Sequence, residues 1–188
     1  MRERAPHEAD ADATVLLMSG PAASGKTTVA RIVASSFERS VHVEADRFFS
    51  FVVGGYVDPW DPDSHEQNRV VMEIAGDVAR RYALAGYVTI LEGMFIPGWF
   101  YEPVRDRLRA DGLVVSGAFI RPPLGTTLER GRSRLPPKLL DDDVLERLWH
   151  SFEDLGPLEA NAFANDTDPP DETAAEIVRR LRAGALDA

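Results

Sequence analysis

Short apolar segments alternate along the chain with longer segments in which apolar residues recur every three or four positions. The short segments have the length of buried strands, and the longer ones have the period of a helix. We expect strands at residues 14–19, 41–44, 87–91, 113–120 and 162–165. We expect helices at residues 28–34, 64–85, 103–110, 124–132, 141–154 and 171–182.

The expected helix at 64–85 carries apolar residues at a spacing that assigns them to its buried face. Ser64 and Gln67 have the spacing of a capping box at its start, and Gly86 marks its end. The residues assigned to the buried face are Val70, Val71, Ile74, Val78, Ala79 and Tyr82.

Strands that alternate with helices predict an α/β fold in three layers, with a mostly parallel five-stranded sheet between helices. We expect one domain over residues 13–188, after a flexible, charged tail at 1–12. In parallel sheets of this kind, ligands bind outside the carboxyl ends of the strands. The residues expected to meet along that edge are Ser19, Gly20, Asp46, Glu92 and Arg121.

Residues 20–27 read Gly-Pro-Ala-Ala-Ser-Gly-Lys-Thr and match the phosphate-binding pattern G-x-x-x-x-G-K-[ST], the P-loop. In a P-loop, backbone N–H groups and the positive end of a helix bind phosphate. The lysine reaches the β- and γ-phosphates, and the hydroxyl ligates Mg²⁺. We therefore predict ATP and Mg²⁺ as cofactors, with Lys26 on the phosphates and Thr27 on the metal. The predicted nucleotide-binding residues of this loop are Gly20, Ala22, Ala23, Ser24, Gly25, Lys26, Thr27 and Thr28.

The chain is acidic, with a formal net charge of −10. This charge disfavours a nucleic acid as partner, whereas the local N–H groups, the lysine and Mg²⁺ still favour ATP. The absence of cysteine excludes disulfides and thiol-ligated zinc. No apolar run approaches the length of a membrane span, and the first twelve residues lack the features of a signal peptide. We expect a cytoplasmic protein without membrane partners, of an oligomeric state that the sequence does not indicate.

The residues at the strand ends distinguish among P-loop proteins. Motor and switch NTPases usually end a strand in an Asp or an Asp-Glu pair, whereas the third strand here ends in Glu92, and the GTPase patterns D-x-x-G and N-K-x-D are absent. A small-molecule kinase needs an acid after the second strand to accept a proton from the substrate hydroxyl, and lid arginines to neutralise the phosphoryl group. Asp46 is an acid directly after the expected second strand. Arg130, Arg132 and Arg134 lie where the lid arginines are expected.

With these residues the chain resembles the P-loop small-molecule kinases. Members of this group include the gluconate and shikimate kinases, chloramphenicol phosphotransferase, the zeta toxins and the kinase half of polynucleotide kinase. The resemblance covers roughly residues 14–182, and the P-loop is its most specific part. It implies direct transfer of the γ-phosphoryl group of ATP to a hydroxyl of a small molecule, within a P-loop kinase domain whose Arg-bearing lid spans roughly residues 131–150.

The resemblance also implies roles for individual residues. Asp46 falls on the acid that orients and deprotonates the acceptor hydroxyl, and Arg134 on the lid arginine that reaches the phosphates. Arg130 falls on the arginine that packs over the adenine, and residues 165–167 on the segment that lines the adenine pocket. Arg47 departs from the pattern, because several relatives carry an arginine three positions after the acid. The predicted residues are Lys26, Asp46 and Arg134 for catalysis, Arg130 and Thr167 for the nucleotide besides the P-loop, and Asp46, Arg47, Phe49 and Glu92 for the substrate.

Other interpretations of these residues remain open. Asp46 is also a favoured N-cap residue for a helix that begins just after it. Glu92 suits a water-mediated Mg²⁺ ligand, an acceptor for a substrate hydroxyl or an acid that only ends a strand. The arginines at 130–134 also suit the solvent-exposed end of a helix, and the acids at 141–143 are explained by helix capping and the helix dipole. We interpret His42 as an ordinary strand residue.

Two aromatic loops bear on the second substrate. Both leave the carboxyl ends of strands, so we hypothesise an apolar, partly aromatic pocket for a hydrophobic, antibiotic-like molecule with one reactive hydroxyl. The alternatives are side chains that only pack a lid and a minor core, a zeta-toxin-like nucleotide-sugar kinase, and a nucleotide-binding regulatory module without catalysis. Nine of the 16 aromatic residues lie in these loops, namely Phe48, Phe49, Phe51, Tyr56, Trp60, Phe95, Trp99, Phe100 and Tyr101.

Overall fold

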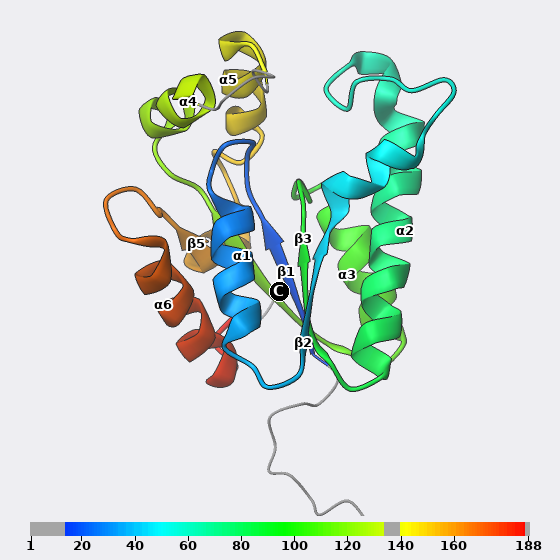
Figure 1. Ribbon diagram of the computed structural model, residues 1–188, viewed down its shortest axis with the longest axis vertical. Helices are drawn as coiled ribbons and strands as arrows, with labels where there is room; N and C mark the ends of the chain where they lie inside the picture. Colours follow the sequence, from blue (N-terminus) through cyan, green and yellow to red (C-terminus); the bar gives the residue numbers. More distant parts are fainter. Residues whose placement is uncertain (1–13, 134–139, 187–188) are drawn as a thin grey trace, which may run out of the picture.

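The computed structural model describes residues 14–133 and 140–186. Their strands form one sheet in the order β2-β3-β1-β4-β5, in which every neighbouring pair is parallel (Figure 1). The predicted α/β fold with a parallel five-stranded sheet is therefore confirmed. The strands are β1 (Thr14–Ser19), β2 (Ser40–Glu44), β3 (Val88–Glu92), β4 (Val114–Ile120) and β5 (Ala162–Phe163).

Helices cover both faces of this sheet. The α-helices are α1 (Lys26–Ser35), α2 (His65–Leu84), α3 (Tyr101–Ala110), α4 (Leu124–Ser133), α5 (Asp142–His150) and α6 (Pro170–Arg182). The 3₁₀ helices are η1 (Ala45–Phe51), η2 (Pro62–Ser64) and η3 (Gly156–Asn161). α1 and α6 pack on one face, and α2 and α3 on the other. α4 and α5 pack on each other beyond the carboxyl ends of the strands, at the top of Figure 1.

The central strand β1 is buried on both faces, because helices cover the sheet on each side. Val15 and Leu17 belong to the core under α2 and α3, whereas Leu16 and Met18 belong to the core under α1 and α6. All four side chains are 0% exposed. Burial of such a side chain contributes about 1.5–3 kcal/mol, so the loop that follows β1 rests on a firmly held strand.

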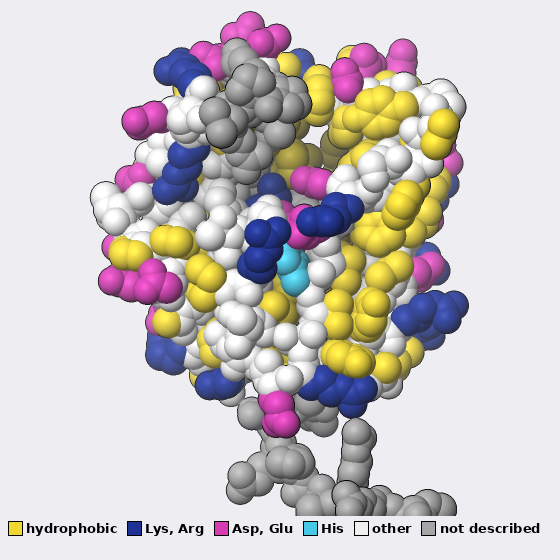
Figure 2. Space-filling view, in the orientation of Figure 1, with side chains coloured by type: hydrophobic (Ala, Val, Ile, Leu, Met, Phe, Trp, Pro, Cys, Tyr) yellow, Lys and Arg dark blue, Asp and Glu magenta, His cyan; other side chains and the backbone are white. Residues whose placement is uncertain are grey.

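The buried face of α2 agrees with the predicted one only in part, since Val71 and Ala79 are 3% and 0% exposed as predicted but other members of the set are not buried. Its core contacts come largely from small side chains, including Ala75, Ala79 and Ala83, which are all 0% exposed. Gly76 also lies inward, where an added Cβ would meet Val104 at 3.4 Å. The helix thus lies close to its neighbours, and the predicted core residues Val70, Ile74 and Tyr82 are 40%, 44% and 42% exposed. Hydrophobic side chains are accordingly visible along this part of the surface in Figure 2.

The predicted capping box at the start of α2 is wrong. The Ser64 hydroxyl donates to the carbonyl oxygens of Pro59 and Asp61, and makes no capping bond. Gln67 instead bonds both the N–H and the carbonyl of Val57, at 3.0 and 2.6 Å. These side chains fasten the preceding loop to the helix. The predicted end is confirmed, since Gly86 has φ 81° directly after the C-cap residue.

Two loop predictions also need correction. The segment expected to be irregular from residue 48 lies partly in η1, which continues to Phe51. β5 pairs only through Ala162 and Phe163, because Asn165 has a φ of 43° that a strand does not adopt. Among the residues that the structure describes, no helix is both long and apolar enough to cross a membrane.

Candidate active site

The loop between β1 and α1 has the backbone of a phosphate cradle. Gly20, Ala23 and Gly25 have φ values of 147°, 62° and 89°. A Cβ on Gly20 would lie 2.2 Å from the carbonyl oxygen of Ile120, so only glycine fits at the end of β1. Left-handed residues of this kind turn successive N–H groups into a concavity that binds anions. α1 begins directly behind the loop, at Lys26, and adds its positive N-terminal end.

Lys26 places a buried cation beside this cradle. Its side chain is 7% exposed, and Nζ donates to the Pro21 carbonyl oxygen at 3.3 Å. Nζ also lies 3.8 Å from Oε1 of Glu92. A buried ammonium needs anionic or hydrogen-bonding partners, and phosphate oxygens bound in the cradle would supply stronger ones than a carbonyl.

Thr27 and Glu92 bring a hydroxyl and a carboxylate together next to Lys26. The Thr27 hydroxyl donates to Oε1 of Glu92 at 3.3 Å. Glu92 ends β3, where it is 2% exposed and aligned with Met18 of β1. Mg²⁺ prefers oxygen ligands and keeps several of its waters, so these residues fit the metal, with Thr27 as a direct ligand and Glu92 as a partner of bound water. Of the three roles left open for Glu92, its contacts favour the one at the metal.

Arg130 and Asn165 hold the other side of the cradle. Arg130 donates to the carbonyl oxygens of Ser24 and Asn165 at 3.1 and 2.8 Å, and the Asn165 amide donates to the Ser24 carbonyl at 3.0 Å. A Cβ on Gly25 would lie 2.8 Å from the Asn165 amide nitrogen, so the contact requires a glycine. Thr167 follows in the exposed loop before α6. Arg130 and Asn165 therefore contact the P-loop at Ser24, whereas the roles of Arg130 and Thr167 at the adenine stay predictions.

The arginines of the predicted lid lie in different places. Arg132 pairs with Asp142 at 2.7 Å and joins α4 to α5, with its side chain 60% exposed. The predicted catalytic Arg134 lies outside the described residues. Asp141 occupies the N-cap position of α5, but its side chain makes no capping hydrogen bond, so capping does not explain that side chain. Asp142 and Asp143 lie in the first turn, where negative charge is favourable.

Arg121 follows β4 on the same edge of the sheet but takes part in other contacts. Its guanidinium pairs with Glu159 and donates to the carbonyl oxygens of Phe152 and Glu153, each at 2.9 Å. It thereby holds η3 and the end of α5 against the sheet. The expected meeting of strand-end residues thus holds for the P-loop and Glu92, which are in contact, whereas the Arg121 side chain supports the scaffold.

Asp46 lies at the mouth of a cavity of about 220 Å³ beside the P-loop. The residue belongs to the first turn of η1, whose N-cap residue is Glu44, so the interpretation of Asp46 as an N-cap is wrong. The cavity also reaches Ala22 of the P-loop. An acid and the phosphate cradle therefore share one cavity, whose lining residues are Ala22, Asp46, Phe49, Tyr56, Pro59, Trp60, Asn68, Met72, Met94, Phe100, Leu140 and Leu148.

The cavity lining is apolar apart from three side chains, those of Asp46, Tyr56 and Asn68. Partial burial, and then the nearby Asp58, raise the pKa of the Tyr56 phenol, so it stays protonated at neutral pH and can donate a hydrogen bond. The cavity lies between the lid helices and the segment before α2, and Figure 2 shows the surface hollowed there with hydrophobic side chains on one wall. Within residues 14–133 and 140–186, no lysine or arginine lines the cavity.

The two aromatic loops divide between this cavity and the core. Phe49, Tyr56, Trp60 and Phe100 line the cavity, which fits the hypothesis of a partly aromatic pocket. Phe95 and Tyr101 are 0% exposed and belong to the core, as the alternative interpretation expects.

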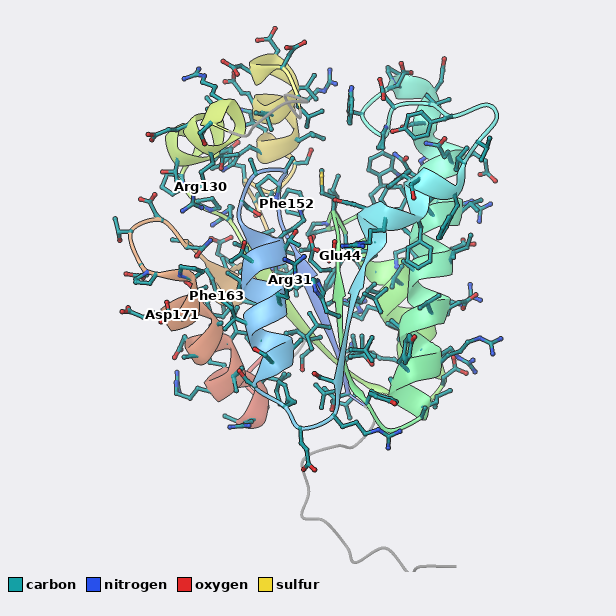
Figure 3. All side chains as sticks on the ribbon, in the orientation of Figure 1. Arg31, Glu44, Arg130, Phe152, Phe163 and Asp171 are labelled. Carbon is teal, nitrogen blue, oxygen red and sulfur yellow. The ribbon has the colours of Figure 1, made fainter. Side chains whose placement is uncertain are left out.

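The predicted substrate residue Arg47 makes its contact elsewhere. Its guanidinium bonds Glu44 at 2.8 Å, its side chain is 73% exposed, and it is not part of the cavity lining. Arg31 of α1 also bonds Glu44. Figure 3 shows the side chains of Arg31 and Glu44 between α1 and the end of β2. A role for Arg47 in substrate binding stays a prediction.

Several residues of the site were missed from the sequence. Asn68 and Met72 of α2 and Leu140 and Leu148 of the lid region line the cavity. An asparagine among the inward residues of an otherwise apolar helix face is a signal that could have indicated Asn68. His42 was interpreted as a strand residue, yet its Nε2 lies 3.5 Å from Oε2 of Glu92.

The chain thus has a three-layer α/β fold with the P-loop pattern at the end of its central strand, β1. Neither models of known protein families nor sequences of curated proteins give a match to this chain. Solved structures do match, over most of this chain and most of their own chains.

The tunicamycin resistance protein of Deinococcus radiodurans matches with a TM-score of 0.68 at 17% identity, over 89% of this chain and 95% of that one. A sugar kinase from a Janibacter species matches with a TM-score of 0.64 at 22% identity, over 93% and 98% of the two chains. A gluconokinase from Sinorhizobium meliloti matches with a TM-score of 0.60 at 19% identity, over 93% of each chain. The resemblance to the P-loop small-molecule kinases is thus confirmed at the level of the fold.

Proposed function

We propose that the protein transfers the γ-phosphoryl group of ATP, bound with Mg²⁺, to a hydroxyl of a small and largely apolar molecule. The observation that carries this proposal is the shared cavity. It joins Ala22 of the phosphate cradle to Asp46, so a hydroxyl placed between them meets both a phosphate and an acid.

The phosphate half of the site neutralises charge. Lys26 and the N–H groups of the P-loop hold the β- and γ-phosphates, while Thr27 and Glu92 hold Mg²⁺ and its water. When bound, Mg²⁺ lowers the charge that opposes attack on the γ-phosphorus. Burial of Lys26 and Glu92 strengthens these interactions, because little water screens them.

The acceptor half places and deprotonates the nucleophile. The acceptor oxygen attacks the γ-phosphorus in line, the bond from that phosphorus to the β–γ bridging oxygen breaks, and ADP leaves. The proton of the hydroxyl passes to Asp46. Positioning by the cavity walls reduces the entropy cost of bringing the two substrates together, and general-base help of this kind contributes about 10²–10⁴-fold.

The lining of the cavity bears on the acceptor's chemistry. A sugar acid would call for lysine or arginine around its carboxylate, and none of the described residues that line the cavity is either. The volume of about 220 Å³ is smaller than typical drug-sized pockets of roughly 300–1,000 Å³. It suits a compact apolar molecule, or one end of a larger antibiotic-like one, with a hydroxyl toward Asp46. The structural similarity to a tunicamycin resistance protein is consistent with that class.

An acceptor panel tests this function. ADP release would be measured with Mg²⁺·ATP and two matched sets of compounds: sugars and sugar acids, and apolar alcohols that include hydroxyl-bearing antibiotics. We expect release well above the acceptor-free rate only with members of the apolar set. Strong preference for gluconate-like sugars would overturn the apolar acceptor, and no acceptor-dependent release together with tight ATP binding would favour a regulatory nucleotide-binding module.

A further inference from the structure

His42 is a buried titratable residue to which the proposed reaction gives no role. It lies on β2, and its side chain is 10% exposed. Nε2 lies 3.5 Å from Oε2 of Glu92, and Nδ1 lies 3.9 Å from Oε1 of Glu44. Among the described residues, Nε2 has no hydrogen-bond partner, and its contact with Oε2 of Glu92 has the distance of an ion pair. An imidazole buried in this way costs free energy unless its nitrogens find polar partners, and the two carboxylates are the groups in reach.

The sheet itself brings these three side chains together. Glu44 is aligned with Glu92 in the pairing of β2 with β3, and His42 lies two positions earlier on β2. Side chains two residues apart on a strand lie on the same face. All three therefore face α1, the helix that carries Thr27, so the arrangement follows from strand register.

The far end of this group is anchored from the surface. Arg47 and Arg31 bond Glu44 at 2.8 and 3.1 Å. The hydrogen bond from Arg47 is the main cause that lowers the pKa of Glu44 below its ordinary value. Glu44 is thus a fixed anion 3.9 Å from Nδ1 on one side of the ring, and the Glu92 carboxylate lies 3.5 Å from Nε2 on the other.

The near end reaches the metal side of the phosphate site. Oε1 of Glu92 accepts from Thr27 and faces Lys26, whereas Oε2 faces His42. Each carboxylate oxygen therefore has its own neighbour. Without the imidazole, nothing among the described contacts would hold Oε2, and the carboxylate could rotate away from Thr27.

We propose that His42 is a positioning residue for the Mg²⁺ site: it holds Oε2 of Glu92 so that Oε1 stays beside Thr27, where the metal and its water bind. The proposal rests on the nucleotide and Mg²⁺ part of the proposed function and is independent of the acceptor. Groups that orient metal-site residues in this way typically change metal affinity by about 10–100-fold when removed.

The test compares nucleotide binding with and without the metal. Binding of ADP would be measured by calorimetry in the presence and absence of Mg²⁺ for the natural protein, His42→Val and His42→Gln. Valine favours strands, so it keeps β2, whereas the glutamine amide can donate from about the place of Nε2. Val41→Ala is the matched control, because Val41 is next to His42 in the chain but packs against the core on the other face of the sheet, under α2 and α3. Thermal unfolding would confirm that each variant is folded.

Without Mg²⁺, we expect His42→Val to bind ADP like the natural protein. We expect it to need about 10–100-fold more Mg²⁺ to reach the tighter ADP binding that the metal gives. His42→Gln should recover most of this loss, and Val41→Ala should show none. An unchanged Mg²⁺ requirement in His42→Val would overturn the proposal, and so would a glutamine variant as impaired as the valine one. If the natural protein bound no ADP under either condition, the proposed function itself would fail, which separates the two outcomes.

Discussion

Lys26 and Glu92 form a buried pair whose partners must change when a nucleotide binds. Their charged atoms lie 3.8 Å apart, with side chains 7% and 3% exposed. Lys26 also bonds the Pro21 carbonyl, which is a weaker acceptor than phosphate. In the function proposed above, a triphosphate in the cradle would compete for Lys26, while Glu92 would stay with Thr27 and the metal. The residue types alone do not indicate this change of partners. It depends on β3 ending at Glu92, where the carboxylate reaches Lys26.

Lys26→Ala should weaken ATP binding and lower turnover. A hydrogen bond to a charged group contributes about 1.5–3 kcal/mol, so we expect a loss of affinity of about 10–100-fold. Calorimetry with Mg²⁺·ATP and steady-state rates would measure the two effects. Arg39→Ala is the control, since Arg39 stacks over Tyr87 away from the site. Full affinity in the Lys26 variant would contradict the interpretation of this loop as a P-loop.

The sequence predicted the P-loop residues well and their buried neighbours poorly. Gly20, Lys26 and Thr27 follow from a local pattern, because the cradle is built within eight consecutive residues. His42 and Asn68 gain their meaning only when strand register and helix rotation bring them beside Glu92 and the cavity. Such contacts join residues far apart in the chain, and a single sequence contains no direct signal for them.

Among the elements, helices and strands were predicted more reliably than the faces that they bury. In α2 the periodic apolar residues Val70 and Ile74 lie outward, and the neighbouring row of Ala75 and Ala79 lies inward. Both rows have helical spacing, so periodicity alone cannot choose between them. The choice depends on how closely the helix approaches the sheet, and small side chains permit a closer approach.

The segment before α2 and the lid helix α5 close the acceptor cavity together. Arg147 of α5 donates to the Trp60 carbonyl oxygen at 3.2 Å, and both Trp60 and Leu148 line the cavity. We therefore expect Trp60→Ala to raise the KM for the acceptor at least about tenfold through lost apolar contact, with little change in the KM for ATP. Tyr82→Ala is the control, because Tyr82 packs on Tyr87 outside the cavity. Equal effects of both variants would argue against this cavity as the acceptor site.

Across the whole molecule, the strand order decides which parts meet. β1 lies between β3 and β4, so the P-loop at the end of β1 is next to Glu92 at the end of β3. Alternating strands and helices predicted a parallel sheet, but this alternation is compatible with several strand orders. The common edge could therefore be predicted, whereas the particular contacts along it could not.

The surface charges predict how stability depends on pH. Hydrogen bonds from arginine are the largest cause that lowers the pKa of six carboxyl groups in the described chain. A lowered pKa in the folded state stabilises the protein above the ordinary value, 4.5 for Glu and 3.8 for Asp, and this stabilisation disappears as the pH falls through the folded-state pKa. The six groups are those of Glu44, Glu66, Asp106, Asp111, Glu159 and Glu176.

Urea unfolding between pH 7 and pH 3 would measure this dependence, with pH 7 as the reference. We expect the free energy of unfolding to decrease once the pH falls below about 4.5, by a modest amount per pair because most of these pairs are exposed. Protonation of the acids also leaves the positive charge of 21 Lys and Arg residues uncompensated, which acts in the same direction. An increase in stability from pH 5 to pH 3 would contradict the assignment.

The most direct measurement is the acceptor-dependent rate of ADP formation by Asp46→Asn, with nucleotide affinity measured on the same preparation. Asparagine keeps the size of the side chain but cannot accept the proton of the hydroxyl. We predict a rate about 10²–10⁴-fold lower than that of the natural protein, with unchanged binding of Mg²⁺·ADP. A rate close to normal would show that Asp46 is not the proton acceptor and would contradict the mechanism.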